Sequence, residues 1–204
     1  MTTLIEQAAA DVEGWTVGQV QQLKNVQMCP VQYKNQTALL QLLPRGDTSI
    51  RVPFAPSEFC GTGDEVHLSI LSETPASVIE QAQKIEATIV EKSRATIPSI
   101  DALWSSCVKP TLHGPQLRCK VNTTGPHKVQ LVDDKGRVDM PIADLQSRRA
   151  LPILNVRGVY IQRNQVGLMI DVAACQVGPK PTESPQISFA QVAPRRSRRT
   201  SLQI

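Results

Sequence analysis

Arg118 and Lys120 are the residues whose type and spacing point most directly to a chemistry. They lie two positions apart in the segment 116–121, where apolar residues alternate with them. Such alternation predicts a β-strand with its apolar side chains on one face and both cations on the other. Cations placed this way are separated by about 7 Å, close to the phosphate spacing of an extended single nucleic-acid strand. The pair therefore predicts a surface that binds successive phosphate groups.

Other residues of the second half of the chain are candidates for the same surface. Lys109, Lys128, Arg157 and Arg163 are expected to extend it with further positive charge. Tyr160, at the end of a predicted strand, is the best candidate for stacking on a base, since proteins that bind single strands combine basic grooves with aromatic rings. Aromatic residues make up only 3% of the chain, and core packing is the alternative role for each ring.

A second group of cations lies near the end of the sequence. Arg195, Arg196, Arg198 and Arg199 surround a single serine. This pattern is typical of a nucleic-acid-binding patch or a nuclear-localisation signal. It also fits the preference of basophilic kinases, and phosphate added there would subtract from the positive charge. A tail that is only solvated is the third interpretation.

Charge is sorted along the chain. Residues 1–102 contain 7 Lys and Arg against 12 Asp and Glu, residues 103–176 contain 10 against 5, and residues 177–204 contain 5 against 1. An acidic half is therefore followed by a basic half and a basic tail. This asymmetry indicates a polyanionic partner, most often nucleic acid.

No catalytic motif stands out in the sequence. The common phosphate-loop, nucleophile-elbow, zinc-protease and dinucleotide motifs are absent, and the three histidines have no cysteine or carboxylate partner at motif spacing. We therefore expect a protein that is not an enzyme, with no catalytic residues, no cofactor and no small-molecule substrate.

The five cysteines are odd in number and widely spaced. Such usage is typical of reduced, partly buried thiols in an intracellular protein. The order Cys107, His113, Cys119, His127 leaves gaps longer than structural zinc sites use, so no metal site is expected. No apolar run reaches the roughly 20 residues of a membrane helix, so no membrane partner is expected either.

One segment has a clear helical pattern, near residues 75–92, where Thr74 is expected to be the cap. Its apolar stripe consists of Val78, Ala82, Ile85 and Ile89. Its opposite face is predicted to be solvated and carries Glu80, Gln83, Lys84, Glu86 and Glu91. Extended segments are predicted at 37–43, 48–52, 66–70, 116–121, 128–132, 151–160 and 166–177.

These elements predict three regions. Residues 1–18 are expected to form an N-terminal lead, residues 19–177 one β-rich domain, and residues 178–204 a basic, proline-rich tail that is disordered when free. The fold class is mainly β with one long helix (α+β), arranged as an OB-like antiparallel barrel or a small sandwich.

The order of several segments carries a resemblance to a known family. The segments are 51–59, 65–71, 103–104, 109–111, 117–121, 151–160 and 166–168. Together they resemble the single-stranded-DNA-binding proteins of nucleocytoplasmic large DNA viruses and related eukaryotic sequences, over roughly residues 30–177. The resemblance implies an OB-type barrel that coats single strands during replication or repair. It also implies that Arg118 and Lys120 belong to the family's basic strand and that Tyr160 takes the place of its aromatic residue.

The sequence therefore predicts a non-enzymatic protein that binds single-stranded nucleic acid mainly through phosphates, inside the cell, in the nucleus or at a viral replication site. The sequence does not decide whether the protein forms a homo-oligomer. The alternative is a structural or assembly protein, such as a virion or scaffold component, that self-associates through complementary acidic and basic faces.

Overall fold

The computed structural model describes most of the chain up to residue 178. The described residues are 2–23, 26–41, 50–51, 57–62, 65–112, 114–125, 127–133, 135–136, 145 and 148–178. For residues 50–51, 57–62 and 65–73 only the backbone is described.

Strands dominate the described residues. The strands are β1 (Thr2–Leu4), β2 (Trp15–Val17), β3 (Gln21–Gln22), β4 (Gln27–Tyr33), β5 (Gln36–Gln41), β6 (Ile50–Arg51), β7 (Ser57–Thr62), β8 (Glu65–Glu73), β9 (Trp104–Ser105), β10 (Val108–Thr111), β11 (Gly114–Asn122), β12 (Gln130–Val132), β13 (Arg149–Gln162) and β14 (Gln165–Val177). The helices are α1 (Ile5–Ala10), α2 (Ala76–Ser93) and α3 (Ile100–Leu103). Within the described residues the strands join into one connected sheet.

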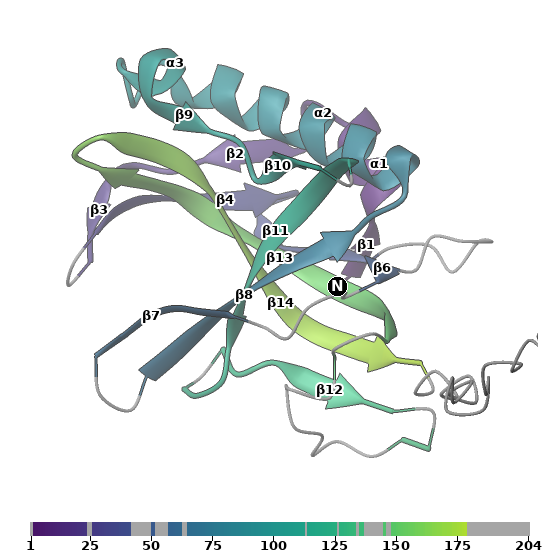
Figure 1. Ribbon diagram of the computed structural model, residues 1–204. Helices are drawn as coiled ribbons and strands as arrows, with labels where there is room; N and C mark the ends of the chain where they lie inside the picture. Colours follow the sequence, from purple (N-terminus) through teal and green to yellow (C-terminus); the bar gives the residue numbers. More distant parts are fainter. Residues whose placement is uncertain are drawn as a thin grey trace, which may run out of the picture.

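The long hairpin of β13 and β14 lies at the centre of this sheet (Figure 1). Its strands pair antiparallel from Ala150 opposite Val177 to Gln162 opposite Gln165. β13 also pairs with β4, β5 and β6, whereas β14 also pairs with β9, β11 and β12. Two register shifts interrupt the hairpin, and irregularities of this kind bend and twist a strand. The hairpin therefore connects most of the other strands into one curved sheet.

Helix α2 packs on the sheet, with α1 and α3 beside it (Figure 1). The predicted apolar stripe of α2 is buried throughout, with Val78, Ala82, Ile85 and Ile89 exposed by 2%, 5%, 2% and 0%. These side chains share one hydrophobic core with inward-facing residues of β11, β13 and β14. Burial of this stripe explains why the segment folds as a helix, because removing apolar surface from water stabilises the helix against the sheet.

The predicted fold class, mainly β with one long helix, is confirmed. The curved, largely antiparallel sheet is consistent with the predicted OB-like barrel. Among the described residues, none of the helices has the length and apolar character needed to cross a membrane.

Most predicted elements are present, with shifted ends. The helix predicted near 75–92 is Ala76–Ser93, and the segments at 66–70, 116–121, 151–160 and 166–177 lie inside β8, β11, β13 and β14. The cap was predicted wrongly, because Pro75 rather than Thr74 occupies the N-cap position and makes no side-chain capping hydrogen bond. The boundaries predicted for the lead, the domain and the tail stay predictions.

The N-terminal segment is built into the body of the fold. β1 pairs with β5, β2 pairs with β4, and Trp15 is 1% exposed. The Trp15 indole donates a hydrogen bond to the Ala8 carbonyl oxygen at 2.8 Å. The Asp11 carboxylate accepts hydrogen bonds from the Tyr33 hydroxyl at 2.9 Å and the Gly14 amide at 3.0 Å, and lies 3.3 Å from the Lys34 ammonium. These contacts, led by the Tyr33 hydrogen bond, hold the pKa of Asp11 below its ordinary value.

This lowered pKa predicts an acid-sensitive contribution to stability. A carboxyl group whose pKa is depressed on folding stabilises the protein above its ordinary pKa of 3.8, and the contribution is lost as the pH falls through the depressed value. We expect Asp11→Asn to melt at a lower temperature than the wild type at pH 5, with the gap closing towards pH 2. Calorimetry across this range measures it. Glu13→Gln, whose side chain is 95% exposed, is the matched control, and a gap that stays constant with pH would contradict the prediction.

Candidate nucleic-acid interface

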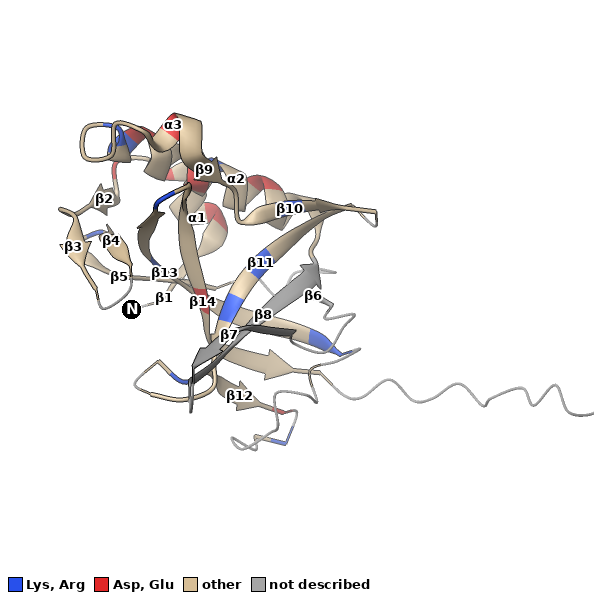
Figure 2. Ribbon diagram, turned by 60° about the vertical axis from the view of Figure 1, so that its left-hand side comes forward, with Lys and Arg blue, Asp and Glu red and all other residues tan. Residues whose placement is uncertain are grey.

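β11 carries two cations on the side of the sheet that faces away from the core. Leu117, Cys119 and Val121 are exposed by 1%, 4% and 0%, whereas Arg118 and Lys120 between them are partly exposed. Because alternate side chains of a strand point to opposite faces, the predicted orientation of both cations is confirmed. Figure 2 shows the basic residues of β11 as two blue bands along the strand.

β14 continues this surface beside β11. Leu168, Ile170 and Val172 are buried in the core, so Asp171 faces the opposite side of the sheet. In the parallel pairing of β11 with β14, Lys120 is the register partner of Asp171. A carboxylate therefore lies next to the cations of β11.

β13 adds a third strand on the far side of β14. Asn155 is opposite Asp171, Tyr160 is opposite Gly167, and Arg157 lies in the register shift between these two pairs. The Arg157 guanidinium reaches the Asp171 carboxylate, which places it on the same face as the cations of β11.

We call this surface of three strands the cationic face. Its members are Gln116, Arg118, Lys120 and Asn122 on β11, Asn155, Arg157 and Tyr160 on β13, and Met169 and Asp171 on β14. Four predicted site residues therefore come together here: Arg118, Lys120, Arg157 and Tyr160. Their contact with nucleic acid stays a prediction.

Asp171 is the buried centre of the cationic face, with only 1% of its surface exposed. Its Oδ2 accepts hydrogen bonds from the Asn122 side-chain amide at 3.1 Å and from Arg157 Nη1 at 3.2 Å. Its Oδ1 and the Oδ1 of Asn155 are buried without a hydrogen-bond partner among the described residues. The three strands are thus joined by side-chain contacts as well as by backbone pairing.

Tyr160 lies across β14 and is half-buried. Its hydroxyl accepts a hydrogen bond from the Gln165 side-chain amide at 2.8 Å. A Cβ atom on Gly167 would lie only 2.6 Å from the Tyr160 hydroxyl and 2.8 Å from the Ser105 carbonyl oxygen, so glycine is needed where the ring crosses the strand. Burial is the main reason why the pKa of Tyr160 lies above its ordinary value, and the phenol stays protonated at neutral pH. Stacking on a base remains a prediction for the uncovered part of this ring.

The other predicted site residues lie outside the cationic face. Lys109, on β10, donates a hydrogen bond to the Ser105 hydroxyl at 2.8 Å, close to Tyr160. Lys128 is exposed between β11 and β12, and Arg163 lies at the tip of the β13–β14 hairpin. The four tail arginines, Arg195, Arg196, Arg198 and Arg199, lie outside the described residues.

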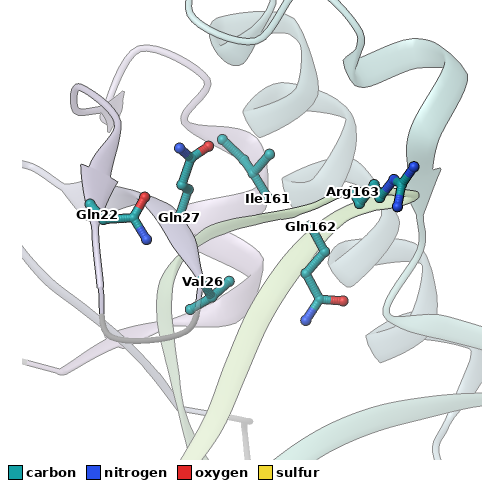
Figure 3. Close-up of a pocket in the computed structure, with 6 residues that line it drawn as sticks. All are labelled: Gln22, Val26, Gln27, Ile161, Gln162 and Arg163. Carbon is teal, nitrogen blue, oxygen red and sulfur yellow. The ribbon is translucent and has the colours of Figure 1, made fainter.

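Arg163 borders a shallow pocket of about 450 Å³ at the end of this hairpin (Figure 3). The pocket is lined by Gln22, Val26, Gln27, Ile161, Gln162 and Arg163. Its three glutamine amides can each donate and accept hydrogen bonds, whereas Val26 and Ile161 supply apolar surface. The structure thus places Arg163 beside neutral polar groups, at the end of the strand that carries Tyr160.

Glu86 was predicted on the solvated face of α2, but the structure buries it. It is only 5% exposed, and its carboxylate accepts hydrogen bonds from the Ser106 hydroxyl at 2.5 Å and the Cys107 amide at 2.6 Å. The prediction was wrong for Glu86 because helical periodicity cannot show that a connecting segment covers part of a polar face. Figure 2 shows acidic residues in red on all three helices, apart from the blue bands of β11.

The cysteines whose side chains are described are buried free thiols: Cys29, Cys107, Cys119 and Cys175. Burial raises the pKa of Cys119 and of Cys175 to about 12, so both stay protonated. Across the described residues, no three His, Cys, Asp or Glu side chains cluster in a way that could hold a metal ion.

Sequence reasoning missed the polar residues that accompany the cations. Asp171 lies in a predicted strand, and alternation along 166–177 already places it opposite the apolar positions. Its neighbours Asn122 and Arg157 come from other strands, and only the register of β14 against β11 and β13 brings them together. That register leaves no local sequence signal.

Comparison with known proteins gives structural similarity only. No protein-family model and no curated protein matches the sequence. The chain is similar to the C-terminally truncated single-stranded DNA-binding protein of bacteriophage Enc34, at 8% identity over 81% of this chain and 96% of that one, with a TM-score of 0.46. It is also similar to that phage protein in complex with single-stranded DNA, at 10% identity over 82% of this chain and 97% of that one, with a TM-score of 0.45. A third similar structure is gp2.5, a single-stranded DNA-binding protein encoded by bacteriophage T7. It has 12% identity over 76% of this chain and 95% of that one, with a TM-score of 0.47. These values do not assign the chain to a family.

The buried Glu86 carboxylate predicts a stability effect. Replacing Glu86 with Ala leaves the buried Cys107 amide without its acceptor, so we expect the free energy of unfolding to fall by about 2–3 kcal/mol. Urea denaturation measures it. Glu80→Ala, at an exposed position of the same helix, should change the free energy by less than about 0.5 kcal/mol. Equal effects of the two substitutions would show that the Glu86 contacts do not stabilise the fold.

Proposed function

We propose that this chain binds single-stranded nucleic acid on the cationic face, without catalysis and mainly through phosphate contacts. The observation that carries the proposal is the convergence of Arg118, Lys120 and Arg157 on one side of the sheet, although they come from strands far apart in the sequence. Phosphate contacts of this kind supply most of the affinity of sequence-independent binding.

The shape of the surface favours a single strand over a duplex. Reading a duplex through its major groove takes a helix or a two-stranded ribbon that fits the groove. Here the helices lie together in a layer that carries acidic residues besides Lys84 and Lys92, whereas two basic residues of β11 lie along the sheet (Figure 2). The alternate positions of Arg118 and Lys120, about 7 Å apart along β11, match successive phosphates of an extended strand.

Neutral side chains of the cationic face suit contact with varied bases. Asn155 is partly exposed beside Arg157, and Tyr160 presents part of its ring on the same strand. The Asn155 Oδ1 is buried, so its side-chain NH2 is the group that can donate to a base, and an aromatic ring stacks on any base. We therefore propose binding that is tolerant of sequence.

Three finer predictions belong to the same proposal. The tail arginines, Arg195, Arg196, Arg198 and Arg199, add phosphate contacts to those of the cationic face. The protein acts in replication or repair, in the nucleus or at a viral replication site. The resemblance to the single-stranded-DNA-binding proteins of large DNA viruses is supported by the sequence pattern alone.

Binding of a fluorescent, unstructured oligonucleotide tests the proposal by anisotropy at low and moderate salt. We expect the wild type to bind at low salt and to weaken steeply as salt rises, because counterions are released from the strand. Replacing Arg118 and Lys120 together with Gln should weaken binding about tenfold and reduce the slope of log affinity against log salt by about 1.4.

The matched control removes the same charge from the helical layer. Lys84→Gln combined with Lys92→Gln on α2 should leave the affinity within about twofold, because screening limits the effect of distant charges. An absence of wild-type binding at low salt, or equal losses in both double variants, would contradict the proposal.

The separation of charge also fits the alternative function, assembly through complementary faces. Acidic residues lie on all three helices and two basic residues lie on β11, so one copy can present its helical layer to the cationic face of another (Figure 2). Sedimentation velocity without nucleic acid separates the two proposals. Nucleic-acid binding predicts a small species whose size does not depend on salt, whereas assembly predicts large species that dissociate as salt rises.

A further inference from the structure

We propose that Asp171 is a positioning residue of the cationic face, whose buried carboxylate fixes the direction in which Arg157 presents its guanidinium to the bound strand. The inference rests on the proposed function. It assigns a role in binding to a negatively charged residue, although its charge by itself would repel the strand. It is carried by the contacts, the burial and the sign of the charge of Asp171.

The geometry shows how the carboxylate holds the guanidinium. The Asp171 side chain is 2% exposed and Arg157 is 24% exposed, so the ion pair lies under the surface with part of Arg157 still reaching solvent. Asn122 of β11, on the other side of β14 from Arg157, donates a second hydrogen bond to the same oxygen, Oδ2. Asp171 is therefore fixed from β11 while it binds Arg157 of β13.

A guanidinium held in this way keeps donors for a second anion. Arg157 uses Nη1 for Asp171, and a guanidinium has five N–H donors in one rigid plane. Fixing that plane before the strand binds removes part of the entropy cost of ordering a long side chain. The ion pair thus prepares the remaining donors for a phosphate.

The sign of the charge argues for this role. A carboxylate in the middle of a phosphate-binding surface repels the ligand, so a surface shaped only by net charge would lack it. In addition, Asp171 Oδ1 has no hydrogen-bond partner among the described residues, and a buried, unpaired acceptor destabilises the fold. Favourable net charge therefore does not explain this residue, and the unpaired Oδ1 offsets part of the stability that its Oδ2 contacts supply, whereas positioning of Arg157 accounts for both the burial and the ion pair.

Asp171→Asn tests the inference, because charge and positioning predict opposite results. The substitution adds one unit of positive charge with almost no change in shape. Positioning predicts that oligonucleotide binding at low salt weakens about fivefold, the size of coupling expected between contacting residues. Glu80→Gln, which adds the same charge at an exposed position of α2, should leave affinity within about twofold.

A double-mutant cycle separates positioning from general damage to the fold. If Asp171 acts through Arg157, Asp171→Asn should no longer weaken binding in an Arg157→Gln background, where only the gain from the removed negative charge remains. Thermal melting of each variant confirms that the folded protein is being compared. Unchanged or tighter binding by Asp171→Asn, or the same fivefold loss in the Arg157→Gln background, would overturn the inference.

A second variant keeps the test decisive if Asp171→Asn does not fold. Arg157→Lys keeps the charge at a partly exposed position but replaces the planar fork with a flexible ammonium. Positioning predicts weakening of about threefold or more, and wild-type affinity would overturn it. Failure of the wild type to bind at low salt would instead reject the proposed function itself, so the two failures are distinguishable.

Discussion

The antiparallel pairing of β13 with β14 is the constraint on which the rest of the structure depends. The hairpin carries β4, β5 and β6 along one strand and β9, β11 and β12 along the other. Its register decides which residues are neighbours across the sheet, placing Asn155 opposite Asp171 and Tyr160 opposite Gly167. A shift by one residue would move every side chain of one strand to the other face. Core and cationic face are thus set by the same register.

Two buried carboxylates mark the two sides of this sheet. Glu86 binds the Ser106 hydroxyl and the Cys107 amide and so connects α2 to the segment that leads into β10. Asp171 binds Asn122 and Arg157 and connects β11 to β13. The first joins the helical layer to the sheet, and the second organises cations on the surface that faces away from the core. Each is a polar contact between segments distant in sequence, which gives specificity to packing that is otherwise apolar.

Periodicity predicted the parts of this molecule that depend on local sequence. The helix near residues 75–92 and the outward orientation of Arg118 and Lys120 follow from spacing alone, because burial of one face imposes a period on each element. Glu86 was predicted on a solvated face and is buried, since the segment that covers it comes from another part of the chain. Asp171 was not predicted as a site residue because its role depends on the register of three strands. Tyr160 was placed on the correct strand, but its position across Gly167 is a tertiary feature.

The central claim is that nucleic acid lies along β11, β14 and β13, and mapping of amide chemical shifts tests it most directly. A short, unstructured oligonucleotide is titrated into isotopically labelled protein at low salt, and perturbed amides are located on the structure. The largest changes should fall on residues 116–122, 155–160 and 167–171, with little change along α2. Changes concentrated on α2 and α3, with the cationic face unaffected, would contradict it.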